Sequence, residues 1–201
     1  KHSGTFGKLG CFSFNGNKII TTGGGGMIVT NDEQLAKKAK HLTTQAKADP
    51  FEYMHDQIGY NYRMVNILAA MGVAQMEILP KILKRKKEIT EIYDEVLRDL
   101  LEVKRQEITE NVQHNNWIYT ITTTYQKELI KDLLDNNIQV RPLWVPMNQL
   151  PIFKKELYIT EKDASDNIYK KTISLPSSSN LTNKEVYFVA NKVKKIICSI
   201  K

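Results

Sequence analysis

A single lysine followed by a run of glycines is the stretch of this sequence best suited to carry chemistry. Lys18 follows a turn-rich stretch, and Gly23–Gly26 come after two apolar residues and two threonines. A neutral lysine amine can form a Schiff base with an aldehyde, and burial or nearby cations favour the neutral form. Glycines let the backbone approach a bound group closely. From these residues alone, Lys18 is either an aldehyde-binding lysine or an exposed lysine in a hairpin loop.

Ser13 lies five residues before this lysine and offers a hydroxyl that can bind a phosphate held on the same side of the chain. The same hydroxyl could instead satisfy a turn. The glycine run is not a P-loop, because no Gly-Lys-Ser/Thr follows it.

The other residue types that often form sites show no such pattern. The four histidines, His2, His41, His55 and His114, have no ligand-like spacing with cysteine or with each other, so we expect no metal site. Cys11 and Cys198 form no CxxC pair, which favours reduced thiols in a cytoplasmic protein over a disulfide framework. The net charge of +7 suits phosphate ligands, but the basic residues are mixed with acids, so we expect no nucleic-acid binding.

The first part of the chain predicts a strand–loop–strand–helix unit. Strands are expected over residues 9–14 and 27–30, and a helix over 33–42, capped by Asn31 or Asp32. Residues 43–62 are polar and predict an irregular loop.

The next helix, from Asn66 to Leu79, has apolar residues around nearly its whole circumference. Such a helix is expected to be buried on most sides, in the core or at a subunit interface. Pro80 is expected to break or kink it, and a more amphipathic helix follows. The sequence has no run of about 18 apolar residues, so we expect no membrane span.

The rest of the chain predicts a compact α+β unit beginning at Lys81. A strand is expected over residues 117–122, a helix over 127–136, an extended segment over 138–141 and a terminal helix over 182–197. The chain therefore divides into residues 1–80 and 81–201.

Three blocks of sequence resemble one enzyme family. SFNGNK at residues 13–18 with TTGGGG at 21–26 resembles the cofactor-lysine motif of the DegT/DnrJ/StrS sugar aminotransferases. GYNYRM at residues 59–64, with AA, G and QME at 69–77, resembles a second signature of that family, and RPLWVPM at 141–147 resembles a third. The blocks occur in the family's order across nearly the whole chain.

The resemblance implies an α/β fold, the type I fold of enzymes that depend on pyridoxal 5'-phosphate (PLP). Residues 1–80 would be the C-terminal part of the large PLP-binding domain, and residues 81–201 the small α+β domain. The family's ring-binding acid, stacking aromatic and phosphate turn precede the lysine, so we expect this chain to lack an N-terminal part and to be inactive alone. Gly24 stands where many members have Glu. Glycine at this position resembles the subgroup that acts on UDP-linked 4-keto-6-deoxy N-acetyl sugars.

By resemblance, Lys18 is the catalytic residue, forming the Schiff base and moving the proton. Ser13 resembles the serine that binds the cofactor phosphate. Asn61 resembles the asparagine that reaches the cofactor phosphate of a neighbouring subunit, which implies a homodimer with shared active sites. Asn61 could equally cap the following helix or hold its loop.

The resemblance also implies substrate contacts. Arg63, Arg141 and Trp144 would bind the substrate, although Arg63 could be an ion-pair partner and Trp144 a local hydrophobic plug. The implied reaction moves an amino group from glutamate to a nucleotide-linked keto sugar in the cytoplasm. Dehydratases of the family have histidine in place of the lysine, which Lys18 argues against. A non-catalytic member that acts as an interaction protein stays open as the alternative.

Overall fold

The computed structural model describes residues 1–49 and 51–200. It divides into two compact units, Lys1–Pro80 and Lys81–Lys201. Their identification as parts of a large and a small domain stays a prediction.

The first unit is built on a hairpin. Strands β1 (Gly10–Ser13) and β2 (Gly26–Val29) pair antiparallel, with Gly10 opposite Val29 and Ser13 opposite Gly26. A short 3₁₀ helix, η1 (Ser3–Thr5), precedes them. Both strands lie within one residue of the predicted ranges.

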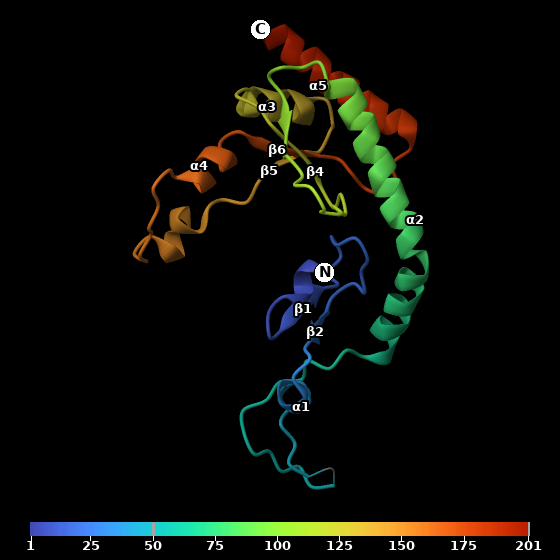
Figure 1. Cartoon of the computed structure of the whole chain (residues 1–201), viewed down its shortest axis with the longest axis vertical. Helices are drawn as coiled ribbons and strands as arrows, with labels where there is room; N and C mark the ends of the chain where they lie inside the picture. The colour runs from blue at the N-terminus through green and yellow to red at the C-terminus, as the bar shows by residue number, and fades with distance from the viewer. Residues whose placement is uncertain (50, 201) are drawn as a thin grey trace. The chain divides into compact units, whose positions relative to one another are not determined.

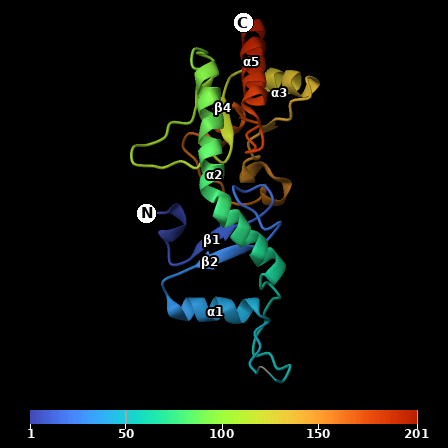
Figure 2. The ribbon, with the colours of Figure 1, turned by 90° about the vertical axis from the view of Figure 1, so that its right-hand side faces the viewer.

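Helix α1 (Glu33–Thr43) lies beside the hairpin in both ribbon views (Figures 1 and 2). The carboxylate of Asp32 accepts the N–H groups of Gln34 and Leu35, so one of the two predicted caps is confirmed. The loop after α1 contains two isolated β-bridges, Thr44 with Asn61 and Lys47 with His55, as expected of an irregular segment.

Helix α2 (Asn66–Leu97) corrects two predictions. It continues through Pro80, so the two expected helices are one. Proline removes one backbone donor, and a long helix can tolerate that loss where its other turns stay intact. The first half is also not buried in the core of the first unit, since Ile67 is 78% exposed, Val73 61% and Met76 55%, whereas its expected burial at a subunit interface stays a prediction. Burial needs a partner surface, and the described residues cover only one face of this segment.

By length and composition alone, α2 is apolar enough to cross a membrane, although the sequence has no unbroken run of about 18 apolar residues. This is weak support for a span, because Gln75 of the same helix is hydrogen-bonded to Thr21 of the first unit. The second half of the helix contributes Ile89, Tyr93 and Leu97 to a protein core.

The second unit contains an antiparallel sheet in the order β3-β4-β6-β5. Its strands are β3 (Lys104–Arg105), β4 (Tyr119–Thr122), β6 (Thr172–Leu175) and β5 (Arg141–Pro142). Its helices are α3 (Gln126–Asp135), α4 (Ala164–Tyr169) and α5 (Asn183–Ile200), with 3₁₀ turns η2 (Met147–Gln149) and η3 (Pro151–Phe153). The predicted strand 117–122 and helices 127–136 and 182–197 are confirmed, whereas β6 was not predicted.

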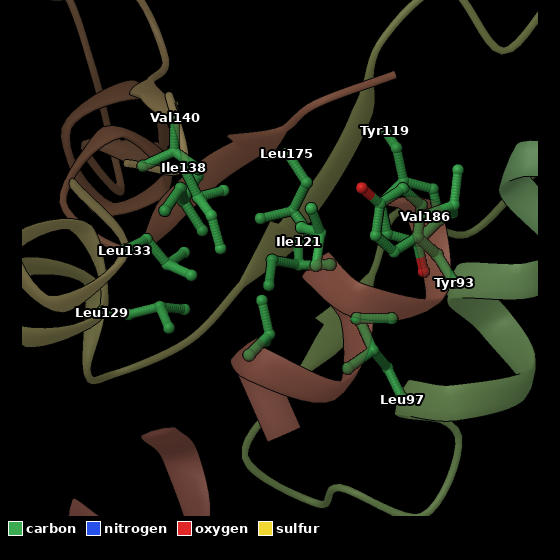
Figure 3. Close-up of a cluster of buried hydrophobic side chains, with 14 of the residues drawn as sticks. Tyr93, Leu97, Tyr119, Ile121, Leu129, Leu133, Ile138, Val140, Leu175 and Val186 are labelled. Carbon is green, nitrogen blue, oxygen red and sulfur yellow. The ribbon is translucent and has the colours of Figure 1, made fainter. Parts of the chain in front are cut away.

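One face of this sheet holds the core of the unit. Tyr119 and Ile121 of β4 alternate with half-buried threonines, and they pair with Leu175 and Ile173 of β6. Figure 3 shows these side chains meeting residues from α2, α3 and α5 in one apolar cluster. Alternation along paired strands puts their apolar side chains on one face, and the helices cover that face.

Candidate active site

The loop between β1 and β2 carries Lys18 and is fastened where it begins and ends. The N–H of Phe14 donates to the carbonyl of Gly25 over 3.0 Å, and the carbonyl of Phe14 accepts the N–H of Thr22 over 3.0 Å. Gly25 has a φ of +92°, a conformation that favours glycine. The loop is therefore held at its neck by backbone hydrogen bonds.

Lys18 lies in a tight turn inside this loop. Its N–H donates to the carbonyl of Asn15 over 3.0 Å, and its side chain is half-buried. The prediction of a lysine at a strand-turn is confirmed by this geometry, whereas its catalytic role stays a prediction.

Ser13 is the last residue of β1 and is exposed. Its Oγ accepts the N–H of Asn15 over 3.3 Å, so it does satisfy a turn. Its own O–H can still donate to a ligand, because a hydroxyl both accepts and donates. The turn and the phosphate interpretations of Ser13 are therefore compatible.

The chemistry of these side chains fits PLP in part. The cofactor presents an aldehyde and a phosphate, and the loop offers an amine at Lys18 and a hydroxyl donor at Ser13, which closes β1 five residues earlier. These two residues would hold the aldehyde and phosphate ends of the cofactor.

Asn61 and Arg63 lie on the segment that runs beside the end of α1. Asn61 is exposed and forms the isolated bridge with Thr44, which agrees with a role in holding the loop. Arg63 is exposed and lines a groove of about 710 Å³ beside the hairpin and α1. Neither Lys18 nor Ser13 lines that groove. The groove therefore does not bring Arg63 together with Lys18.

Arg141 and Trp144 belong to the second unit. Arg141 lies in β5 opposite Ser174 and is exposed. Trp144 is 69% exposed, and its ring stacks on that of Trp117 with centroids 6.2 Å apart and planes 23° apart. A largely exposed ring is not a hydrophobic plug, so the stacked pair offers an aromatic surface to solvent.

Sequence patterns single out neither Trp117 of this aromatic pair nor the lysine that holds its backbone. The sequence indicates Trp117 only as part of a strand. The buried amine of Lys86 donates to the carbonyl of Trp117 over 2.7 Å and also to that of Ser177. Burial lowers the pKa of Lys86, because desolvation disfavours its charged form. No sequence pattern singles out this lysine among its many neighbouring charged residues.

A polar cluster lies at the edge of the same core. The hydroxyl of Tyr119 donates to Asp94 over 2.7 Å, and Asp94 also pairs with Arg105. Burial, and then the neighbouring carboxylate, raise the pKa of Tyr119 well above its usual value of 10.0. This cluster joins α2 to β3 and β4, and we assign it a structural role.

Among the described residues, no group of three or more His, Cys, Asp or Glu side chains gathers in a way that could hold a metal ion.

Comparison with known proteins identifies the family to which these features belong. The sequence model of the DegT/DnrJ/EryC1/StrS aminotransferase family matches residues 1–194. The chain belongs to this family. The resemblance inferred from the three sequence blocks is thereby confirmed.

Two curated relatives of the chain have names that describe enzymes of nucleotide-linked sugars. The chain is 37% identical to GDP-perosamine synthase of Escherichia coli O157:H7, covering 97% of this chain and 53% of the relative. It is 29% identical to UDP-4-amino-4,6-dideoxy-N-acetyl-beta-L-altrosamine transaminase of Campylobacter jejuni strain 81-176, covering 100% of this chain and 55% of the relative. The chain thus spans about half the length of these relatives.

A solved structure supports the fold. PseC of Helicobacter pylori, described as an aminotransferase involved in the biosynthesis of pseudoaminic acid, superposes with a TM-score of 0.90 at 28% identity. The match covers 99% of this chain and 56% of PseC. The DegT/DnrJ/EryC1/StrS chain therefore has the α/β fold of type I PLP-dependent enzymes, as predicted.

Proposed function

We propose that this chain is part of a PLP-dependent aminotransferase that moves an amino group from glutamate to a keto carbon of a nucleotide-linked sugar. The observation that carries the proposal is the half-buried Lys18 in a loop whose two ends are joined by backbone hydrogen bonds from Phe14 to Thr22 and Gly25. Family membership and the names of the relatives support the reaction class.

When bound, PLP supplies the electron-withdrawing ring that stabilises negative charge at the amino-acid or sugar carbon. The residues of this chain then have to hold the cofactor and move the proton. The Nζ of Lys18 would hold the aldehyde end of the cofactor, and its amine would take up and release the proton of the reacting carbons. The Ser13 hydroxyl, five residues before Lys18, would hold the phosphate end.

Two subunits would complete each site. Asn61 is exposed on a loop that is held to the end of α1 by its bridge with Thr44. An exposed amide on a fixed loop can donate to a phosphate bound by another subunit. We therefore propose a homodimer in which Asn61 of one protomer reaches the cofactor phosphate of its partner.

The substrate side would be formed by Arg63, Arg141 and Trp144. Guanidinium groups bind phosphates through paired donors, which suits a nucleotide diphosphate. The Trp117–Trp144 pair offers a flat apolar surface on which a base or sugar can stack.

The decisive experiment is to trap the cofactor on its lysine. The full-length protein is incubated with PLP, reduced with borohydride, digested and mapped by mass spectrometry. We expect the label on Lys18, no label there in Lys18→Ala, and normal labelling in the matched variant Lys8→Ala. A label on another lysine of the wild-type protein contradicts the proposed role of Lys18.

The same experiment separates the enzyme from a non-catalytic member of the family. A scaffold kept for partner binding would leave Lys18 unlabelled in the folded wild-type protein. Labelling followed by transfer of nitrogen from ¹⁵N-glutamate to a sugar supports the enzyme.

The nucleotide is proposed only by class. Gly24 favours UDP-linked 4-keto-6-deoxy N-acetyl sugars, whereas the identity to GDP-perosamine synthase favours GDP-linked sugars. Parallel assays with a UDP-linked and a GDP-linked 4-keto-6-deoxy sugar decide between them, and inactivity with both contradicts the proposed substrate class. Such activated sugars and glutamate meet in the cytoplasm, which is where we place the reaction.

A further inference from the structure

The first half of α2 has one covered face within the first unit. Leu68, Gly72, Gln75 and Leu79 are half-buried, and every other residue from Asn66 to Ile78 is exposed. Their spacing of four, three and four residues puts them on one side of the helix. At least two of the four contact the loop that carries Lys18.

Gln75 contacts this loop through a hydrogen bond. Its side-chain oxygen Oε1 accepts the N–H of Thr21 over 3.3 Å, across 54 residues of sequence. Thr21 is also tied to the rest of the loop. Its hydroxyl donates to the carbonyl of Phe14 over 3.0 Å and accepts the N–H of Gly23 over 2.8 Å.

Gly72 lets the helix come close to the next residue of the loop. Thr22 is only 2% exposed, and a Cβ placed on Gly72 would lie 3.1 Å from the Cγ2 of Thr22. That separation is tighter than ordinary van der Waals contact, so a larger residue would push Thr22 and its backbone away.

We propose that Gln75 is a positioning residue for Lys18, with Gly72 providing the close approach that Gln75 needs. Phe14 and Thr21 bound the loop from Asn15 to Ile20, and Lys18 lies between them. The Gln75 amide fixes the Thr21 end to a rigid helix, so the amine of Lys18 keeps one position relative to Ser13. The inference rests on the proposed function, in which Lys18 binds the cofactor.

The first test measures the loop itself and needs no cofactor. In Gln75→Met the N–H of Thr21 loses its acceptor, and we expect its amide hydrogen to exchange about fivefold to tenfold faster. Gln75→Glu keeps a side-chain oxygen at the same reach and should keep the wild-type exchange rate. Glu77→Met makes a similar change at an exposed position of the same helix and should leave Thr21 unaffected.

The second test measures the lysine. The rate at which Lys18 is trapped by PLP and borohydride is followed against pH in the full-length protein. A loosened loop should slow trapping in Gln75→Met and move its pH midpoint, while Glu77→Met keeps the wild-type profile. A role in stability alone would leave the pH midpoint of the folded variant unchanged.

Gly72→Ala provides an independent variant. Alanine favours the helix more than glycine does, so the helix itself is not weakened. Faster exchange at Thr21 and Thr22 in this variant supports the proposed close approach. Unchanged Thr21 exchange in Gln75→Met, or an equal change in Glu77→Met, overturns the proposal. If Lys18 of the wild type is never trapped, the proposed function fails, and the exchange data still decide whether Gln75 holds the loop.

Discussion

At the scale of single residues, the aromatic pair of the second unit is a surface rather than a core element. Trp144 is 69% exposed and rests on half-buried Trp117, whose carbonyl is held by the amine of Lys86. A side chain of this kind contributes little to the free energy of unfolding, and it can contribute to the binding of a flat ligand that stacks on it.

We therefore expect Trp144→Ala to raise KM for the nucleotide sugar about fivefold, which corresponds to about 1 kcal/mol of lost stacking. The KM for glutamate and the melting temperature should stay close to wild type. Steady-state kinetics with each substrate varied in turn measure both constants. Ile152→Ala changes another exposed apolar residue of the second unit and serves as the control. An unchanged sugar KM would remove Trp144 from the substrate site.

At the scale of elements, the start of α5 is held by a reciprocal cap. The carboxylate of Glu185 accepts the N–H of Thr182 over 2.7 Å and its hydroxyl over 2.8 Å, and the N–H of Glu185 donates to the Thr182 hydroxyl over 3.3 Å. These hydrogen bonds favour the charged carboxylate and hold the pKa of Glu185 below its ordinary value of 4.5.

The lowered pKa predicts an acid-sensitive contribution to stability. It is fully present above pH 4.5, the ordinary value, and is lost as the pH falls through the lower pKa of the folded state. Glu185→Gln should therefore flatten the fall of the melting temperature over this range, and Glu161→Gln, at an exposed site, should not. Thermal unfolding between neutral and acidic pH measures the effect, and parallel curves for wild type and Glu185→Gln would contradict it.

Removing the other half of the cap has a separate effect. Thr182→Ala should cost about 1 kcal/mol at neutral pH, because an N-terminal backbone donor of α5 loses its acceptor. Urea unfolding of the second unit measures this loss. A cost near zero would mean that water replaces the hydroxyl without penalty.

At the scale of the whole molecule, the two units differ in how much they bury. All members of the buried apolar cluster lie in the second unit, from Ile89 to Ile197. Among the described residues of the first unit, Ala46 is the single buried residue with an apolar side chain. Stability against local opening follows such burial.

We expect amide exchange in this 201-residue chain to be slowest in β4, β6 and α5 and fast in the β1–β2 hairpin. Ile121→Ala should destabilise the second unit by about 2–5 kcal/mol, because it leaves a cavity at a site that is only 1% exposed. Ile67→Ala, at a 78% exposed site, should change little. Exchange mass spectrometry tests both, and a hairpin protected as strongly as β4 would contradict the expected pattern.

The proposed dimer makes a further prediction for the whole molecule. If Asn61 serves the partner's site, Lys18→Ala and Asn61→Ala are each inactive, but a mixture forms hybrid dimers with one intact site. After unfolding and remixing in equal amounts, about a quarter of wild-type activity should return. No recovery from folded hybrid dimers would place Asn61 in the same site as Lys18 of its own protomer.

Sequence by itself was enough for the local and chemical features. The strand–turn–lysine–glycine pattern, the Asp32 cap and the helices after residues 33, 126 and 183 depend on neighbouring residues, and the structure confirms them. The three motif blocks identified the family for the same reason, since each is continuous in sequence. Lys18 and Ser13 are cofactor candidates for that reason too, because the residue types and the spacing that mark them lie within one short stretch.

Tertiary structure alone decided what depends on distant partners. Strand β6 is four residues long and becomes recognisable only by pairing with β4 and β5. The apolar residues of α2 predicted burial, but only the structure shows which face is covered and that Thr21 and Thr22 meet it. Gln75 belongs to the second motif block, but its hydrogen bond spans 54 residues, so its proposed connection to Lys18 appears only when the chain is folded.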